Sequence, residues 1–377
     1  MPTAHIVIDI RVTQGGYPGI GRAAEGLVRA LLERPGPYCF SLLFRPEAPL
    51  SAALRDAVRR SHRLLPIMAH LRAGRDQWET PLRLKQAHAD LYHATYFARA
   101  LRPGVPTVVT VHDLIPERYP QYWPRGQEQV IRRWLRASAR AARYVVTPSE
   151  ASAADVEALY GVPRSRLSVC YNALDELSGT EHTDRPAEIG ARAFILCVCT
   201  NKPHKNLPRL VRAFGKLTTT SSTAPDLVIA GGWDVRYPEA LEAAEVFGAA
   251  QPTNGPMVRF VHQPSDAALL WLYGHALAFA FPSLYEGFGI PVLEAMRSGV
   301  PVAASNTAAV AEVAGNAALL FDPLNEDAIA GAMRRLVEEP DLRARLSEAG
   351  RGRAVQFSLR DSADRMLQIY AEALCSG

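Results

Sequence analysis

The chain lacks several sequence features that would each indicate a particular class of protein. Its 377 residues include five cysteines, an odd number without a C-x-x-C pair, so neither a disulfide framework nor a zinc site is indicated. No run approaches the roughly 20 apolar residues of a membrane-spanning helix. His5 and Asp9 interrupt the apolar stretch at the start, which argues against a secretory leader. These absences predict a protein of the reducing cytoplasm.

Charge is distributed unevenly along the chain. Residues 1–150 carry 22 Lys and Arg against 12 Asp and Glu, whereas the remainder carries 20 against 26. A basic half and a mildly acidic half indicate different partners for the two halves. The basic half contains no recognisable nucleic-acid-binding module, so a nucleic-acid partner is not expected.

Apolar runs of strand length alternate with amphipathic helical stretches, which is the pattern of parallel sheets with crossover helices. The expected strands of the first half cover residues 5–10, 39–44, 91–93, 107–111 and 144–147. Those of the second half cover residues 194–199, 226–230, 258–261, 276–281, 301–304 and 318–321. This count fits two doubly wound α/β domains, with the polar segment 176–192 as linker and residues 358–374 as a terminal helix.

The most informative segment is residues 278–296, where a glycine-containing loop joins an apolar strand to a helix. Gly287 and Gly289 allow backbone N–H groups to approach a ligand closely, and Pro291 suits the first turn of a helix. Free N–H groups at a helix N-terminus favour an anion such as a diphosphate.

Two carboxylates, Glu286 and Glu294, flank this turn. Each can accept two hydrogen bonds from the neighbouring hydroxyls of a sugar. Taken singly, Glu286 is better explained by solvation, and Glu294 by the helix dipole. Taken together with the glycine turn, they favour a ligand site.

The stretch from Glu286 to Glu294 resembles the E-x7-E motif of the family-four retaining glycosyltransferases, which have the GT-B fold. The likeness continues in residues 299–302 and 312–318, which are similar to the family's G-x-P-V and E-V-x-G-x-A-x segments. The resemblance implies two Rossmann-like domains that face each other across a cleft. Residues 1–175 would form the acceptor side, with 358–377 as a helix crossing back, and residues 193–357 would hold the nucleotide sugar.

The resemblance also implies roles for individual residues. In enzymes that this chain resembles, the first glutamate contacts the donor sugar near its reacting centre, and the second holds the ribose. These roles fall on Glu286 and Glu294. The loop amides of Phe288, Gly289 and Ile290 would face the diphosphate and the sugar.

A lysine follows the first strand of the second domain, where it is well placed for a phosphate. Residues 200–207 resemble the family's P-R-K-N segment, which implies that Lys205 pairs with the diphosphate. The sequence departs from the family here because His204 stands where arginine is usual. Lys202 is a candidate for the missing positive charge.

Two candidates lie in the first half. The stretch that contains Gly16 is not G-x-G-x-x-G, so a dinucleotide site is not supported, but it resembles the family's G-I-G-R-Y entry to the first helix. Gly16 would approach the donor phosphates, although an ordinary tight turn explains it nearly as well. The V-H-D-L segment resembles the family's cleft histidine, which implies that His112 faces the donor sugar. Residues 92–95 and 147–149 are expected to line the acceptor side.

The implied reaction transfers a hexose with retention of anomeric configuration. The chain contains no D-x-D pair, so neither a metal nor another cofactor is expected, and Lys205 and the loop amides would meet the charge of the leaving group. The chain resembles mannosyltransferase-like members that assemble bacterial surface polysaccharides. This implies GDP-mannose as donor and a saccharide or lipid-linked saccharide as acceptor.

Three alternatives stay open. The donor could instead be a UDP- or dTDP-sugar. The protein could be a nucleotide-sugar epimerase of the same fold, which needs no acceptor. It could also be a non-catalytic subunit that binds a nucleotide sugar.

Arginines recur at helical spacing along residues 128–143 and again near residue 60, namely Arg132, Arg136, Arg140 and Arg143, and Arg55, Arg59 and Arg63. A solvated arginine face and a surface that docks on anionic lipid explain this pattern equally well. The second explanation would put this cytoplasmic protein at the inner face of the membrane, beside a lipid-linked acceptor.

Overall fold

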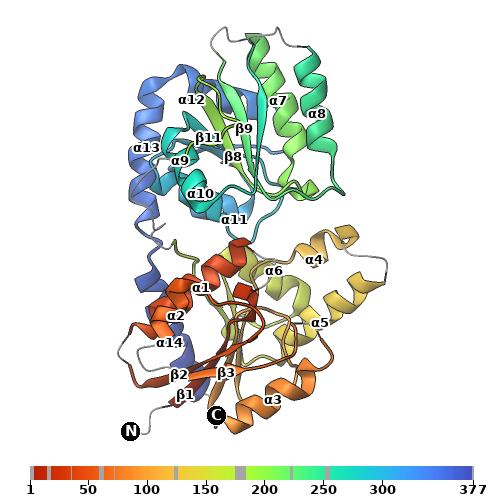
Figure 1. Ribbon diagram of the computed structural model, residues 1–377, viewed down its shortest axis with the longest axis vertical. Helices are drawn as coiled ribbons and strands as arrows, with labels where there is room; N and C mark the ends of the chain where they lie inside the picture. Colours follow the sequence, from red (N-terminus) through yellow and green to blue (C-terminus); the bar gives the residue numbers. More distant parts are fainter. Residues whose placement is uncertain are drawn as a thin grey trace. The chain divides into compact units, whose positions relative to one another are not determined.

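The computed structural model describes residues 4–14, 18–34, 36–58, 63–71, 73–122, 126–174, 184–220, 224–250 and 255–375. The chain divides into two compact units (Figure 1). Unit 1 comprises residues 1–175 with 357–377, and unit 2 comprises residues 176–356. Each unit contains one parallel sheet of its own.

Unit 1 contains a seven-stranded parallel sheet with the order β3-β2-β1-β4-β5-β6-β7. Its strands are β1 (Ala4–Asp9), β2 (Tyr38–Phe44), β3 (Arg63–Pro66), β4 (Leu91–Ala94), β5 (Thr107–Thr110), β6 (Tyr144–Thr147) and β7 (Leu167–Val169). The strand order runs outward in both directions from the neighbouring pair β1 and β4. In doubly wound folds this switch point is where loops diverge and leave room for a ligand.

The helices of unit 1 include the last helix of the chain. They are α1 (Pro18–Leu32), α2 (Ala52–Val58), α3 (Asp76–Gln86), α4 (Ile115–Arg118), α5 (Gln127–Ala141), α6 (Glu150–Tyr160) and α14 (Leu359–Cys375). Met366, Ile369 and Tyr370 of α14 are fully buried in the same apolar core as β1, β2 and α1. The final helix is therefore an integral part of unit 1.

Unit 2 contains a six-stranded parallel sheet with the order β10-β9-β8-β11-β12-β13. Its strands are β8 (Phe194–Val198), β9 (Asp226–Gly231), β10 (Val258–His262), β11 (Ala278–Phe281), β12 (Val302–Ser305) and β13 (Ala318–Phe321). Its helices are α7 (Leu207–Thr220), α8 (Glu239–Ala249), α9 (Asp266–His275), α10 (Ile290–Arg297), α11 (Ala308–Ala314), α12 (Glu326–Glu338) and α13 (Pro340–Ala354). The switch point of this sheet lies between β8 and β11.

The two doubly wound sheets confirm the predicted fold class, and the eleven predicted strands are present to within two residues. The prediction omits β3 and β7. β3 is a short edge strand with exposed Arg63 and Leu64, and β7 has only three residues with the buried Ser168 at its centre, so neither shows a long apolar run.

One expected pattern is wrong. Arg55 lies on α2, which ends at Val58, whereas Arg63 lies on β3, so the two do not share a helical face. Arg59 lies outside the described residues. Within the part of the chain that the structure describes, no helix is both long and apolar enough to cross a membrane.

Candidate active site

The switch point of unit 2 brings together two segments that lie about 80 residues apart in the sequence. β8 pairs with β11, so the loops that follow these strands leave the same edge of the sheet side by side. The first loop leads to a 3-10 turn, Pro203–Lys205, and the second contains Glu286 and the glycine turn. This edge is the place where open parallel sheets bind ligands.

Lys205 and Glu286 form an ion pair at this edge. The Lys205 Nζ lies 2.5 Å from the Glu286 Oε1 and 5.8 Å from the centroid of the Phe281 ring. The two side chains are 15% and 12% exposed, so they are sheltered but still reachable from solvent. Sequence reasoning selected both residues, and the structure adds that they contact each other.

Hydrogen bonds hold the two loops against each other. The Leu284 N–H donates to the His204 carbonyl at 2.7 Å. Asn206 adopts a left-handed backbone conformation, with φ of 61°. Its side-chain amide donates to the carbonyls of Pro282 at 3.1 Å and Pro323 at 2.8 Å. Lys205 is the last residue of the 3-10 turn and is followed by Asn206. Helix α7 begins at Leu207. These contacts fix the position of Lys205 beside Glu286.

His204 does not supply the second positive charge at this site. Its side chain is buried, and burial lowers its pKa to about 2, an effect to which the neighbouring Lys205 and Lys202 add. Lys202 is half-buried and helps Arg236 to lower the pKa of Asp234 to about 2. The charge of Lys202 therefore acts on the loop that follows β9.

The glycine turn leads directly into α10. Gly289 has a φ of +126°, a conformation that L side chains rarely adopt, and α10 begins at Ile290 with Pro291 in its first turn. The N–H groups of the first helical turn cannot bond within the helix. Phe288 is buried, whereas Ile290 is partly exposed. The turn thus has the local geometry of an anion site.

Glu294 lies in the second turn of α10 and is only 3% exposed. The Tyr273 hydroxyl, from α9, donates a hydrogen bond to the Glu294 Oε2 at 2.9 Å. Tyr273 is buried, and the sequence analysis gave it no role. Its hydroxyl holds the Glu294 carboxylate in one orientation.

The loop after β9 completes this edge of the sheet. Gly231 has a φ of +148°, and a Cβ there would lie 2.1 Å from the Cys199 carbonyl oxygen, so only glycine fits. Asn201 donates to the carbonyls of Asp234 and Tyr237, both at 2.7 Å, and accepts from the Asp234 N–H. The ends of β8 and β9 are thereby held together. No simple sequence signal marks Asn201.

His112 of unit 1 is buried at the carboxyl edge of its sheet. Its Nε2–H donates to the Thr95 carbonyl at 2.9 Å, which leaves Nδ1 as an acceptor without a partner among the described residues. Burial lowers the pKa of His112 to about 4, so the ring is neutral at physiological pH. It lines a small pocket together with Thr95, Asn172 and Met366. A neutral imidazole nitrogen at a pocket wall can accept a hydrogen bond from a hydroxyl group.

Two other residues of unit 1, Gly16 and His93, were also expected to lie at the site. Gly16 lies outside the described residues. His93 was expected to line an acceptor site, but it is fully buried between the Tyr370 hydroxyl at 2.6 Å and the Thr110 hydroxyl at 2.9 Å. This expectation is wrong because the side chain points into the core, where it ties α14 to the sheet.

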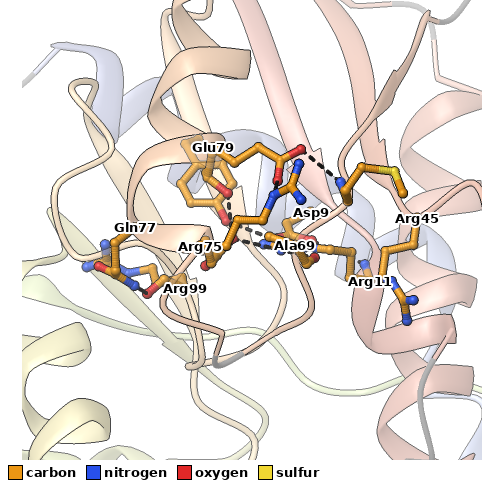
Figure 2. A network of polar contacts seen from close by, with 12 residues as sticks. Asp9, Arg11, Arg45, Ala69, Arg75, Gln77, Glu79 and Arg99 are labelled. Atoms are coloured by element: carbon orange, nitrogen blue, oxygen red, sulfur yellow. Dashed lines mark hydrogen bonds and ion pairs between the residues drawn. The ribbon is translucent and has the colours of Figure 1, made fainter.

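Unit 1 also contains a buried polar network that sequence reasoning missed (Figure 2). The Arg11 guanidinium contacts the Asp9 carboxylate at 2.5 Å and the Asp76 carboxylate at 2.7 Å, and the Tyr92 hydroxyl donates to Asp9 at 2.7 Å. All four residues are at most 3% exposed. Burial alone would lower the pKa of Arg11, but Asp9 and Asp76 raise it. The network occupies the end of β1 in unit 1.

The arginines of α5 contact neighbouring elements. The Arg132 Nε lies 2.6 Å from the Glu117 Oε2, and an Nη of Arg136 lies 3.8 Å from the other oxygen of that carboxylate. Arg140 donates to the Tyr160 carbonyl at 2.6 Å. These side chains hold α5 against α4 and α6, which accounts for their helical spacing.

Comparison with known proteins assigns the family. The model of the group 1 glycosyl transferases matches residues 180–353, and that of Glycosyltransferase Family 4 matches residues 18–176. Both models describe sugar-transferring enzymes. The chain belongs to the family-four, group 1 glycosyltransferases.

Several curated relatives are mannosyltransferases. O-antigen chain mannosyltransferase B of Escherichia coli is 28% identical over 277 residues, which are 70% of this chain and 69% of that protein. The O-antigen chain mannosyltransferase RfbU of Salmonella typhimurium is 29% identical over 239 residues, 63% of each chain. The MMP alpha-(1->4)-mannosyltransferase of Mycolicibacterium hassiacum is 28% identical over 72% of this chain and 66% of its own. The chain thus spans about two thirds of the length of these relatives.

Solved structures support the same fold. HepE of Anabaena, in complex with UDP and glucose, has a TM-score of 0.72 and 18% identity, with 98% of this chain and 100% of that chain covered. WaaG, a glycosyltransferase involved in lipopolysaccharide biosynthesis, has a TM-score of 0.71 and 17% identity, with 99% and 100% covered. At these identities the likeness establishes the fold, which is GT-B.

Proposed function

We propose that this glycosyltransferase moves mannose from GDP-mannose onto a saccharide or lipid-linked saccharide during surface polysaccharide assembly, with retention of anomeric configuration. The observation that carries the proposal is the ion pair between Lys205 and Glu286 beside the glycine turn of Gly289. The mannose assignment rests on the mannosyltransferases among its relatives. A lipid-linked acceptor would place this protein at the inner face of the membrane.

The proposed donor contacts follow from the chemistry of each group. An ammonium has three N–H donors, so Lys205 can contact a phosphate oxygen while it keeps Glu286 in place. The amides of Phe288, Gly289 and Ile290, with the dipole of α10, would face the diphosphate and the sugar. Glu286 would accept hydrogen bonds from sugar hydroxyls, and Glu294, oriented by Tyr273, would accept them from the ribose.

The proposed reaction needs no metal ion, because Lys205 and the amides of the turn meet the charge that develops on the leaving diphosphate. The bond between the anomeric carbon and the diphosphate oxygen breaks, and the acceptor oxygen bonds to the same face of that carbon. A leaving-group oxygen takes the acceptor proton. His112, which is neutral, would accept a hydrogen bond from a donor hydroxyl through Nδ1.

A donor panel tests the proposal. Thermal shift and ligand-observed NMR with GDP-, UDP- and dTDP-sugars should show binding of GDP-mannose, and Glu286→Gln should abolish transfer while the protein stays folded. Transfer that persists in excess chelator would support metal independence. Failure of every nucleotide sugar to bind would overturn the proposed function.

Product analysis separates the remaining alternatives. Conversion of the donor sugar without an acceptor would indicate an epimerase. Donor binding with equal turnover in wild type and Glu286→Gln would indicate a non-catalytic subunit. A UDP- or dTDP-sugar that binds better than GDP-mannose would replace the proposed donor and leave the class of reaction intact.

A further inference from the structure

Helix α3 of unit 1 buries two carboxylates and exposes two of its large apolar side chains. Its two carboxylates, Asp76 and Glu79, are 0% and 3% exposed, whereas Trp78 is 57% and Leu82 is 45% exposed. Charged side chains are rarely buried and large apolar ones are normally the buried face of a helix. The exposure of Trp78 and Leu82 therefore needs an explanation other than packing within unit 1.

Polar contacts hold α3 in this orientation. Asp76 bonds to Arg11 at 2.7 Å and to the Thr80 hydroxyl at 2.7 Å. Glu79 accepts from the Met68 N–H at 2.9 Å and pairs with the Arg75 Nε at 2.6 Å (Figure 2). Because these contacts pair both inward carboxylates with arginines, the helix cannot rotate to bury Trp78 without leaving charges unpaired.

The outward side of α3 forms one continuous face. Trp78, Leu82 and Lys85 follow one another at intervals of four and three residues, so they lie on the same side of the helix. Arg75, which immediately precedes α3, lies over the Trp78 ring with its guanidinium carbon 5.4 Å from the centroid. Met68, 42% exposed, adjoins α3 through its bond to Glu79. We call Met68, Arg75, Trp78, Leu82 and Lys85 the α3 face.

We propose that the α3 face docks on the interface of an anionic lipid bilayer. This inference rests on the proposed function, which would place the protein at the inner face of the membrane, and it assigns the membrane contact to α3 rather than to the arginines of α5. Tryptophan, leucine and methionine would enter the boundary between headgroups and acyl chains, while Lys85 and Arg75 reach anionic headgroups.

The composition of the face favours a lipid surface over a protein partner. The carboxylates of α3 are turned inward, so this helix exposes apolar side chains, Lys85 and the neutral Gln77 and Gln86, but no carboxylate. Three apolar side chains are few for a stable protein interface, which occupies about 800 Å² on each partner. They are sufficient for shallow insertion that is reinforced by charge.

Vesicle sedimentation tests the proposal on the full chain. Wild type should pellet with vesicles of phosphatidylglycerol mixed with phosphatidylcholine, and should pellet less with phosphatidylcholine alone. Trp78→Ala combined with Leu82→Ala should weaken partitioning about tenfold or more, since two interfacial anchors are lost. Lys85→Glu should weaken binding to the anionic vesicles specifically.

The matched control is Val130→Ala, which removes an apolar side chain that is 60% exposed on α5 and should leave partitioning unchanged. GDP-mannose binding and thermal melting of each variant show that it is folded. Equal pelleting of the double variant and wild type would overturn the proposal, as would failure of wild type to bind anionic vesicles. A loss of self-association in the double variant would assign the face to a second copy. Each of these three results would leave the proposed function standing, because donor binding is measured without vesicles.

Discussion

The two units share a topology but treat their switch points differently. In unit 1 the end of β1 is closed by Asp9, Arg11 and Asp76, none more than 3% exposed. In unit 2 the loop after β8 supplies Lys205 and the loop after β11 supplies Glu286, and the two form an ion pair that solvent can reach. Two doubly wound sheets that differ by one edge strand thus support a closed polar core in one unit and an accessible ion pair in the other.

This comparison separates charges that stabilise the fold from charges that a ligand could contact. A network of buried charges that satisfy one another stabilises the packing only while it is complete, because any remaining partner would be a buried, unpaired charge. The Lys205–Glu286 pair is partly exposed to solvent, so an incoming anion could take the place of one partner. Removing one cation from each unit should therefore have opposite consequences for stability and for activity.

The largest effect is expected for Arg11→Met, which leaves Asp9 and Asp76 buried without their partner. The free energy of unfolding should fall by about 3–5 kcal/mol, as measured by urea denaturation. The matched variant Lys205→Met, at a partly exposed pair, should cost about 1 kcal/mol or less. Equal losses in the two variants would show that the comparison between the units is wrong.

The same Lys205→Met variant should have the larger effect on activity. Loss of the cation from the turn should lower turnover about 10²- to 10³-fold, the usual cost of removing one group that stabilises developing negative charge. Arg11→Met, assayed below its melting temperature, should retain turnover within a few-fold. Sugar transfer followed by mass spectrometry provides the measurement, and unchanged turnover in Lys205→Met would remove this residue from the mechanism.

A smaller effect is expected for Tyr273→Phe, which removes the hydroxyl that orients Glu294. Donor affinity should fall about tenfold, in line with the loss of one hydrogen bond to a charged group. Calorimetric titration with GDP-mannose measures this. In a Glu294→Gln background the second substitution should have little further effect, and fully additive losses would contradict a positioning role.

The smallest effect is a pH dependence of stability. The folded state holds the pKa of His112 at about 4 and that of His93 at about 3 through burial, whereas an unfolded histidine titrates near 6.5. Unfolding therefore takes up protons below about pH 6.5, and stability is lost as pH falls from there toward pH 4. The melting temperature of wild type should fall between pH 7 and pH 5, and that of His112→Asn should fall less. Parallel curves would contradict this assignment.

Most of the fold could be predicted because central strands of parallel sheets are continuous apolar runs. The eleven strands with such runs were found, whereas β3 and β7 were not, since an edge strand and a three-residue strand need no long run. Of the candidate site, Glu286, Glu294 and the turn at Gly289 could be recognised because they are close in sequence and form one motif.

The remaining parts of the site depend on contacts between distant segments. Lys205 and Glu286 lie 81 positions apart, and no local pattern states that they touch. Tyr273 contacts Glu294 only because α9 and α10 both lie beside β11. His93 looked like a site residue, but its partners, Thr110 and Tyr370, come from β5 and α14 and place it in the core.

The amino-acid sequence by itself determined the alternation of strands and helices and the carboxylate-flanked glycine turn, since both are local patterns. The tertiary structure alone decided which charges are buried and which are accessible. Helix α3 shows the reason. Its apolar residues would be assigned to the core by periodicity, yet Arg11, which precedes it by 65 residues, binds Asp76 and turns Trp78 and Leu82 outward.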